Sequence, residues 1–230
     1  MERRKELAAN LATVRNRITA ACHTVGRSPS EVTLVVVTKL WPASDIRLLA
    51  ELGVSDVGES RNQEATAKAT QCADLGLTWH FVGQLQVNKC NSVATYADVV
   101  HSVDRLRLVT ALSKAAERAE RRLTCLIQVS VDGDPARGGV PITAFTPLAD
   151  AVVAARGLRL GGVMAVAPPG GDPAAAFDLL AIVAAQLQGI YFYATAISAG
   201  MSMDLESAIS AGATHVRIGT AVLGLRPPLG

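Results

Sequence analysis

The sequence lacks a strong excess of charge of either sign. Its 22 lysines and arginines stand against 20 aspartates and glutamates, which gives a formal net charge of +2 over 230 residues. No long run of basic residues occurs, so the electrostatic footprint of a nucleic-acid-binding protein is missing. We therefore expect no nucleic acid among its partners.

Closely spaced metal-ligand and disulfide motifs are also absent. The four cysteines contain no CxxC pair and the four histidines are spread singly along the chain. Neither a zinc site nor a disulfide framework is therefore expected, and the cysteines should be reduced residues of the core or of helices. The residues concerned are Cys22, Cys72, Cys90, Cys125, His23, His80, His101 and His215.

No secretion signal and no membrane span are predicted. The charged stretch 1–18 lacks the apolar segment of a signal peptide. The apolar stretch 179–201 is interrupted by Gln186, Gln188 and Gly189, which favours a helix followed by a strand over a membrane-spanning helix. We expect a cytoplasmic protein without a membrane partner.

Segments rich in β-branched residues alternate with segments of helical spacing along the whole chain. The predicted strands are 32–38, 54–60, 77–83, 97–103, 123–131, 158–166, 191–198 and 214–224, and the predicted helices are 3–25, 45–52, 61–74, 85–95, 105–121, 145–156, 173–187 and 203–211. Such alternation implies parallel βαβ units. Eight units fit a single (β/α)8 barrel domain over 1–230 with an extra N-terminal helix.

The competing architecture is an open doubly wound sheet, which usually carries a glycine-rich fingerprint after its first strand. Lys39-Leu40-Trp41-Pro42 stands at that position instead. This departure favours the closed barrel, in which the C-terminal ends of all strands surround one mouth and functional residues gather there.

The first predicted strand ends in a lysine, Lys39, directly after the apolar run 32–38. Removing an ammonium from water costs on the order of several kcal/mol unless it pairs with an anion or loses its charge. A lysine in such a place is a candidate for Schiff-base or general-base chemistry. The alternative is a lysine whose ammonium reaches the surface at the end of a strand.

Hydroxyls and glycines follow the seventh and eighth predicted strands. Ser198 and Ser202 belong to the first of these loops, and Gly219 and Thr220 belong to the second. Barrel enzymes commonly bind phosphate at these two loops, and in a closed barrel the last strand lies beside the first. A phosphate there would lie near Lys39, an arrangement that suits pyridoxal phosphate (PLP). Ordinary turn and capping chemistry is the alternative for either loop alone.

Arg217 alternates with Val216 and Ile218 in the last predicted strand, so its side chain should point into the barrel mouth. A guanidinium only donates hydrogen bonds. Set against the pyridine nitrogen of PLP, it would leave that nitrogen unprotonated and the ring a weak electron sink. The alternative is a salt bridge between Arg217 and a neighbouring carboxylate.

Other polar residues near strand ends carry weaker hypotheses. His80, between Trp79 and Phe81, is expected to be a hydrogen-bonded core residue. Glu59 and Arg61 are expected to pair with each other.

Six blocks of this chain resemble the pyridoxal phosphate homeostasis proteins, which are single-barrel relatives of the alanine racemase N-terminal domain. The blocks are VVVTKLWP at 35–42, VGESRNQEA at 57–65, WHFVGQLQVNK at 79–89, HSVD at 101–104, GGVMAV at 161–166 and ISAGMSMDLESAISAGATHVRIGTAVLG at 197–224. They are distributed along nearly the full length of the chain, in the order that the family shows.

The resemblance implies roles for individual residues. Lys39 is similar to the family's aldimine lysine, and Arg217 to the arginine that faces the pyridine nitrogen. The implied phosphate contacts are Ser198, Gly219 and Thr220, with Ser202 as a further candidate. The chain departs from the family at Ser60, where an asparagine is usual, and at Ala199, where methionine is common.

The resemblance implies a PLP carrier in vitamin B6 homeostasis, without robust catalysis, that serves PLP-dependent apoenzymes as a monomer. An amino-acid racemase is the alternative, but it needs an acid/base group on each face of the substrate. Related racemases take the second group, a tyrosine, from another domain that this sequence does not contain. A lyase or aldolase acting on a sugar phosphate through Lys39 is a third hypothesis.

Overall fold

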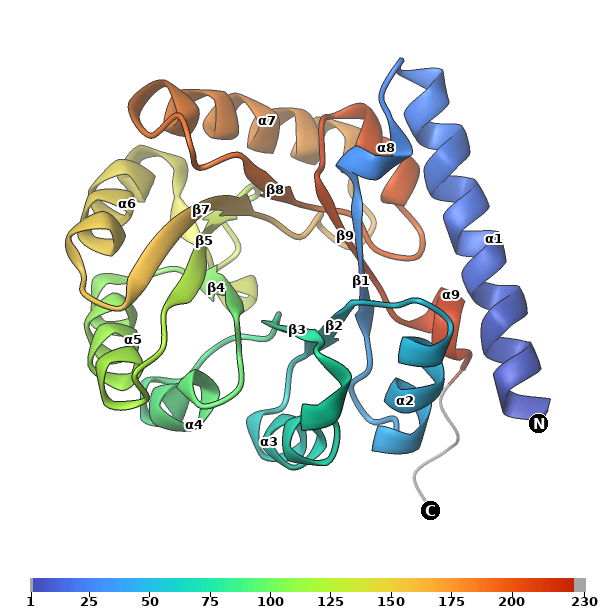
Figure 1. The fold of residues 1–230 in the computed structure, drawn as a ribbon. Helices are drawn as coiled ribbons and strands as arrows, with labels where there is room; N and C mark the ends of the chain where they lie inside the picture. The colour runs from blue at the N-terminus through green and yellow to red at the C-terminus, as the bar shows by residue number, and fades with distance from the viewer. Residues whose placement is uncertain (1, 226–230) are drawn as a thin grey trace.

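The computed structural model describes residues 2–225, in which a parallel sheet closes into a barrel (Figure 1). The strands are β1 (Thr33–Val37), β2 (Asp56–Glu59), β3 (Thr78–Phe81), β4 (Val99–Val103), β5 (Leu123–Ser130), β6 (Val140–Pro141), β7 (Leu158–Met164), β8 (Ala196–Ser198) and β9 (His215–Ile218). Their order is β4-β3-β2-β1-β9-β8-β7-β5-β6, and a β4–β5 pairing closes the ring. The predicted (β/α)8 barrel is confirmed.

Helices form a layer around this barrel (Figure 1). They are α1 (Glu2–Thr24), α2 (Ala43–Glu51), α3 (Asn62–Gln71), α4 (Cys90–Ala94), α5 (Leu106–Arg118), α6 (Phe145–Ala154), α7 (Pro173–Ile190), α8 (Leu205–Ser210) and α9 (Thr220–Leu223), with short 3-10 turns at Pro29–Glu31, Ala73–Leu75, Val87–Lys89, Pro135–Arg137 and Ile142–Ala144.

The first and last strands of the barrel lie side by side. In the β1–β9 pairing Thr33 lies opposite His215 and Val35 lies opposite Arg217. The β-branched run of β1 is buried between the barrel interior and the helical layer. The loops that follow β1 and β9 therefore leave the sheet at neighbouring positions, as the barrel prediction requires.

The extra helix α1 lies against the outside of the barrel, beside the first and last strands β1 and β9 (Figure 1). Its buried residues recur at helical spacing and pack against α8 and α9. Arg17 pairs with Glu206 at 2.7 Å, and Arg3 pairs with Asp45 at 2.8 Å. α1 thus closes the outer layer beside the β1–β9 seam.

All eight predicted strands extend beyond the observed ones, and the last two are the most overextended. α7 continues to Ile190 and a turn follows, in which Ala194 N donates to Tyr191 O, so β8 begins only at Ala196. β9 ends at Ile218 because the chain turns into α9 after Gly219. The predicted loop 132–144 also contains the short strand β6, which pairs with β5.

α7 has the length and apolar composition of a membrane-spanning helix, with a third of its residues buried. Those residues form one face, which packs against β7, β8 and α8. The helix followed by a strand predicted for 179–201 is confirmed, because α7 is an outer-layer helix of the barrel.

The cysteines are confirmed as free, buried core residues. Burial raises the pKa of Cys125 to about 12 and that of Cys90 to about 11. These thiols are therefore protonated packing groups at neutral pH.

Candidate functional site

A pocket of about 380 Å³ opens at the C-terminal ends of β1 and β9. Five of the six predicted site residues line it, namely Lys39, Ser202, Arg217, Gly219 and Thr220. They come from three loops or strands that are far apart in the sequence. The closed barrel therefore brings together the lysine, the arginine and one hydroxyl-and-glycine cradle, as predicted.

A tight turn presents Lys39 at the end of β1. The amide of Trp41 donates to Thr38 O at 3.1 Å, so residues 38–41 form a β-turn. Leu40 has φ of 68°, a left-handed conformation that costs roughly 1–2 kcal/mol for a residue other than glycine. Its amide donates to Glu64 Oε1 at 2.7 Å. A side chain on α3 therefore helps to hold a strained residue directly beside Lys39.

A buried ionic network also stabilises this turn. Lys68 Nζ lies 2.8 Å from Glu59 Oε1 and 3.0 Å from Glu64 Oε1, and it donates to Thr38 O at 2.9 Å. The Thr38 hydroxyl also donates to Glu59 Oε1 at 2.7 Å. The predicted pairing of Glu59 with Arg61 was wrong, because Glu59 points inward to Lys68. Burial raises the pKa of Glu59 more than these hydrogen bonds lower it.

The cradle of hydroxyls and backbone amides lines the same pocket as Lys39 of this turn. Ser202 Oγ accepts from Ala221 N at 3.3 Å, so the loop before α8 is tied to the start of α9. Gly219, the residue before α9, approaches Val37 O so closely that an added Cβ would lie 3.3 Å from it. The cradle and the end of β1 are thus in direct contact.

Arg217 is 5% exposed and points into the pocket, as strand alternation predicted. Nη1 donates to Ser198 Oγ at 2.6 Å and Nη2 donates to Ala165 O at 2.9 Å. Within residues 2–225 no carboxylate forms an ion pair with it, so the alternative of a direct salt bridge was wrong. Burial lowers the pKa of Arg217 to about 10, and the guanidinium remains charged at neutral pH.

Ser198 is the predicted site residue that does not line the pocket. It is fully buried as the last residue of β8, and its hydroxyl bonds Arg217 and, at 2.9 Å, His101 Nδ1. Arg217 separates it from the cavity, so a contact to a phosphate does not fit this position. The sequence placed Ser198 in the loop with Ser202, whereas its side chain faces the barrel axis.

Three histidines that are distant in the sequence gather inside the barrel. The ring centroids of His80, His101 and His215 are 5.1 to 6.4 Å apart. His80 hydrogen-bonds His101 at 2.8 Å and Asp56 at 2.9 Å, which confirms it as a hydrogen-bonded core residue. Burial is the main cause that lowers the pKa of His215 to about 4 and that of His101 well below its usual value. Histidines that are spread singly along the sequence thus lie close together in the folded barrel.

Sequence reasoning missed Asp56 and His101, which are linked to Arg217 through buried hydrogen bonds. Both lie on inward-facing positions of strands, a position that alternation along β2 and β4 can indicate. Among residues 2–225, no three His, Cys, Asp or Glu side chains are placed to hold a metal ion.

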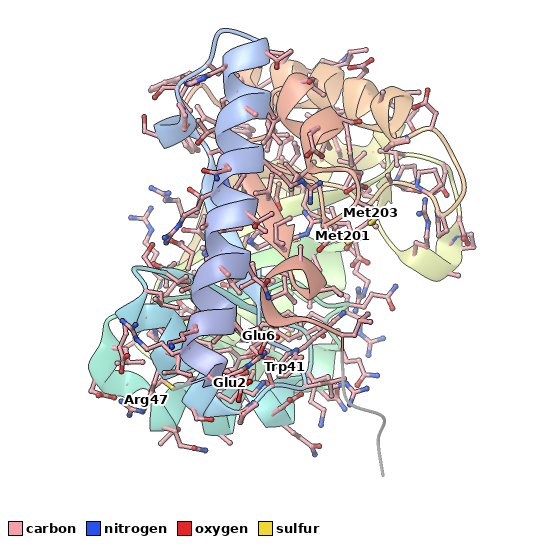
Figure 2. All side chains as sticks on the ribbon, turned by 90° about the vertical axis from the view of Figure 1, so that its right-hand side faces the viewer. Glu2, Glu6, Trp41, Arg47, Met201 and Met203 are labelled. Carbon is pink, nitrogen blue, oxygen red and sulfur yellow. The ribbon has the colours of Figure 1, made fainter. Side chains whose placement is uncertain are left out.

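Large apolar side chains surround the pocket mouth. Met201 and Met203 lie next to each other in the loop before α8, and Trp41 lies beside the N-terminal end of α1 near Glu6 (Figure 2). The guanidinium of Arg3 lies 4.5 Å from the Trp41 ring centroid. Met203 is 92% exposed, so an apolar rim at this mouth faces solvent.

This geometry places the chain in a class of single parallel barrels with a lysine at the end of the first strand and loops rich in hydroxyls and glycines after the last two. The family model for the N-terminal domain of alanine racemase matches residues 4–227. The alanine racemase of Corynebacterium glutamicum shares the fold, with a TM-score of 0.67 and 16% identity over 99% of this chain and 62% of that chain.

Relatives with higher sequence identity match this chain over nearly its full length. The pyridoxal phosphate homeostasis protein of Mycobacterium tuberculosis is 42% identical, covering 98% of this chain and 95% of the relative, and that of Escherichia coli K12 is 39% identical, covering 96% and 97%. PipY of Synechococcus elongatus, solved with PLP bound, has a TM-score of 0.82 and 31% identity over 95% of this chain and all of that chain. The chain belongs to the pyridoxal phosphate homeostasis protein family.

Proposed function

We propose that this protein binds PLP reversibly through Lys39 and carries it in cytoplasmic vitamin B6 homeostasis, supplying PLP-dependent apoenzymes. The observation that carries the proposal is the shared pocket of Lys39, Arg217 and the cradle at the β1–β9 seam. PipY, solved with PLP bound, and curated relatives named for PLP homeostasis support it. The Lys39 amine would condense with the PLP aldehyde, forming a C=N bond and releasing water.

The pocket residues suit the parts of this ligand. Ser202 Oγ and the backbone of Gly219 and Thr220 are positioned as one group that can hold a phosphate. Arg217, which can only donate, would face the pyridine nitrogen and leave it unprotonated. A ring without that proton is a weak electron sink, which favours holding PLP, or racemisation, over transamination.

Borohydride trapping tests the proposal directly. We expect purified protein incubated with PLP to show visible absorption, and reduction followed by peptide mass spectrometry to locate one pyridoxyl group on Lys39. Lys39→Ala should lose the band, whereas Lys114→Ala, a matched change at an exposed lysine on α5, should keep it. A wild type that takes up no PLP, or a Lys39→Ala variant that keeps the same band, would refute the proposal.

The pocket also bears on the racemase alternative. Its ionisable lining side chains are Lys39, Arg217 and Asp204, and Asp204 Oδ1 already accepts from Met201 N at 2.6 Å. Neither Tyr191 nor the other two tyrosines line this pocket. We therefore expect the PLP-loaded protein to form no D-alanine from L-alanine, as chiral chromatography can measure; rapid D-alanine formation would favour the racemase.

A further inference from the structure

A continuous chain of hydrogen bonds crosses the barrel interior and ends at Arg217. The bonds are Asp56 Oδ1 to His80 Nε2 at 2.9 Å, His80 Nδ1 to His101 Nε2 at 2.8 Å, His101 Nδ1 to Ser198 Oγ at 2.9 Å, and Ser198 Oγ to Arg217 Nη1 at 2.6 Å. Asp56 is the first residue of β2, so these hydrogen bonds extend from the N-terminal end of the barrel to the pocket at the opposite end.

With both imidazoles neutral, the chemistry of these groups gives the chain one direction. The Arg217 guanidinium can only donate, so Ser198 Oγ accepts from it and gives its own proton to His101 Nδ1. His101 then carries its proton on Nε2 and donates to His80. His80 in turn carries its proton on Nε2 and donates to the Asp56 carboxylate. Every donor points toward Asp56, and no bond in the chain lacks a proton.

This arrangement bears on how a buried guanidinium without an ion-paired carboxylate is balanced. Burial lowers the pKa of Arg217, and Asp204, which lines the same pocket, attracts the guanidinium at longer range and raises that pKa by less. An isolated buried charge is strongly unfavourable, and Arg217 forms no ion pair within residues 2–225. Asp56 is ionised, since its hydrogen bonds from His80 and Ser55 hold its pKa below the usual value despite burial. The four bonds join the two opposite charges across the buried interior of the barrel, where hydrogen bonds polarise one another.

We propose that Ser198, His101, His80 and Asp56 are positioning residues, which hold Arg217 charged and oriented toward the pyridine nitrogen of the ligand. The proposal rests on the proposed PLP-binding function and assigns Ser198 a role other than phosphate contact. It also predicts that a carboxylate at the far end of the barrel influences the spectrum of PLP bound at the mouth.

The first test needs no cofactor. Long-range ¹H–¹⁵N NMR of the apoprotein should show His80 and His101 as neutral imidazoles, each protonated on Nε2. An imidazolium at His80, or a proton on Nδ1 of His101, would reverse the direction of the chain and overturn the proposal. This result is independent of whether the protein takes up PLP.

The second test measures coupling between the ends of the chain. Asp56→Asn and Ser198→Ala should each weaken PLP binding roughly five- to ten-fold and shift the visible maximum in the same direction. The double variant should bind PLP about as weakly as either single variant, because both substitutions interrupt the same chain of hydrogen bonds. Asp178→Asn on the exposed face of α7 is the matched control. Additive effects, or an effect of Ser198→Ala without one of Asp56→Asn, would overturn the proposal.

A second pocket, of about 580 Å³, lies at the same mouth over the ends of β2, β3 and β4 and shares Ser60 with the Lys39 pocket. Arg61, Lys89 and Arg105 line it, and its lining contains no aspartate or glutamate. The remaining polar lining consists of one serine, one asparagine and three glutamines. Its volume is in the range of small-molecule sites.

Two of the three cations that line this second pocket have no ionic partner among the described residues. Arg61 and Lys89 form no ion pair within residues 2–225, and Arg105 is oriented by Asp104 and by donating to Leu85 O at 2.7 Å. The nearby carboxylate of Glu64 is engaged by Lys68 and the Leu40 amide instead. We infer that this pocket binds a small organic anion that carries a phosphate or carboxylate group.

Calorimetric titration of Lys39→Ala protein with inorganic pyrophosphate tests this second site. We expect saturable binding that weakens at least ten-fold in a variant that also carries Arg61→Ala and Lys89→Ala, while Lys114→Ala leaves it unchanged. No saturable heat, or equal affinity in all variants, would overturn the inference. Because Lys39 is absent throughout, the outcome does not depend on PLP binding.

Discussion

At the scale of single residues, Gly200 shows how tightly the loop after β8 is built. Its φ is 89°, and an added Cβ would lie 2.7 Å from the Cβ of Ala208. We expect Gly200→Ala to lower the free energy of unfolding by roughly 2–4 kcal/mol, combining backbone strain with overpacking. Gly170 has a similar φ of 73° but open space around it. Gly170→Ala should therefore cost only about 1 kcal/mol. Urea denaturation measures both, and equal losses would contradict the steric argument.

The ionic network beneath Lys39 gives a second prediction at this scale. Lys68→Met leaves the carboxylate of Glu59, whose side chain is fully buried, without its cation. We expect a loss of roughly 3–5 kcal/mol in unfolding free energy. The double variant Glu59→Gln/Lys68→Met removes both charges and should recover much of that loss. Chemical denaturation of the wild type, the single variant and the double variant measures these differences. A double variant no more stable than Lys68→Met would show that the buried unpaired charge is not the cause of the loss.

Residue types at strand ends made much of the site predictable. Lys39 follows an unbroken β-branched strand, and alternation alone oriented Arg217 into the mouth. The contact between His101 and Ser198 was not predictable, because it depends on which side chains from non-consecutive strands meet inside the barrel. The contacts of Glu59 with Lys68 and Thr38 depend instead on how α3 packs against the end of β1. Nothing local in the sequence encodes the distance between β4 and β8.

At the scale of elements, α1 lies outside the repeating βα pattern and yet buries a full apolar stripe. Leu11 in its middle is 1% exposed. We expect Leu11→Ala to reduce the unfolding free energy by roughly 2–5 kcal/mol, through lost burial and the cavity that remains. Asn16→Ala, an exposed change on the same helix, is the control. A loss near zero in thermal or urea denaturation would mean that α1 does not contribute to the folded barrel.

Helices and strands were predicted correctly where the hydrophobic period is clear, and their boundaries were misplaced where the chain changes direction. The helix–strand alternation gave the correct order of elements around the barrel. The late start of β8 and the early end of β9 follow from helix continuation at Tyr191 and from the turn at Gly219. An apolar stretch that crosses such a boundary has the same composition on both sides, so periodicity cannot locate the boundary.

At the scale of the whole molecule, the buried histidines link stability to pH. The pKa of His215 is lowered from 6.5 to about 4, so the unfolded chain takes up a proton there before the folded barrel does. The stabilisation is therefore complete above pH 6.5 and declines as the pH falls toward 4. The difference amounts to about 3 kcal/mol for His215 alone. His101, whose pKa is lowered further, extends the decline in the same direction.

Urea denaturation between pH 7.5 and 4.5 measures this dependence. His215→Gln should flatten the decline of unfolding free energy with falling pH, whereas His23→Gln, at an exposed position near the end of α1, should leave the slope unchanged. Asp56 adds a further loss only at lower pH, because its pKa lies below 3.8. A slope that His215→Gln does not alter would mean that the imidazole is not held neutral inside the barrel, and that the interior is wetter than its packing indicates.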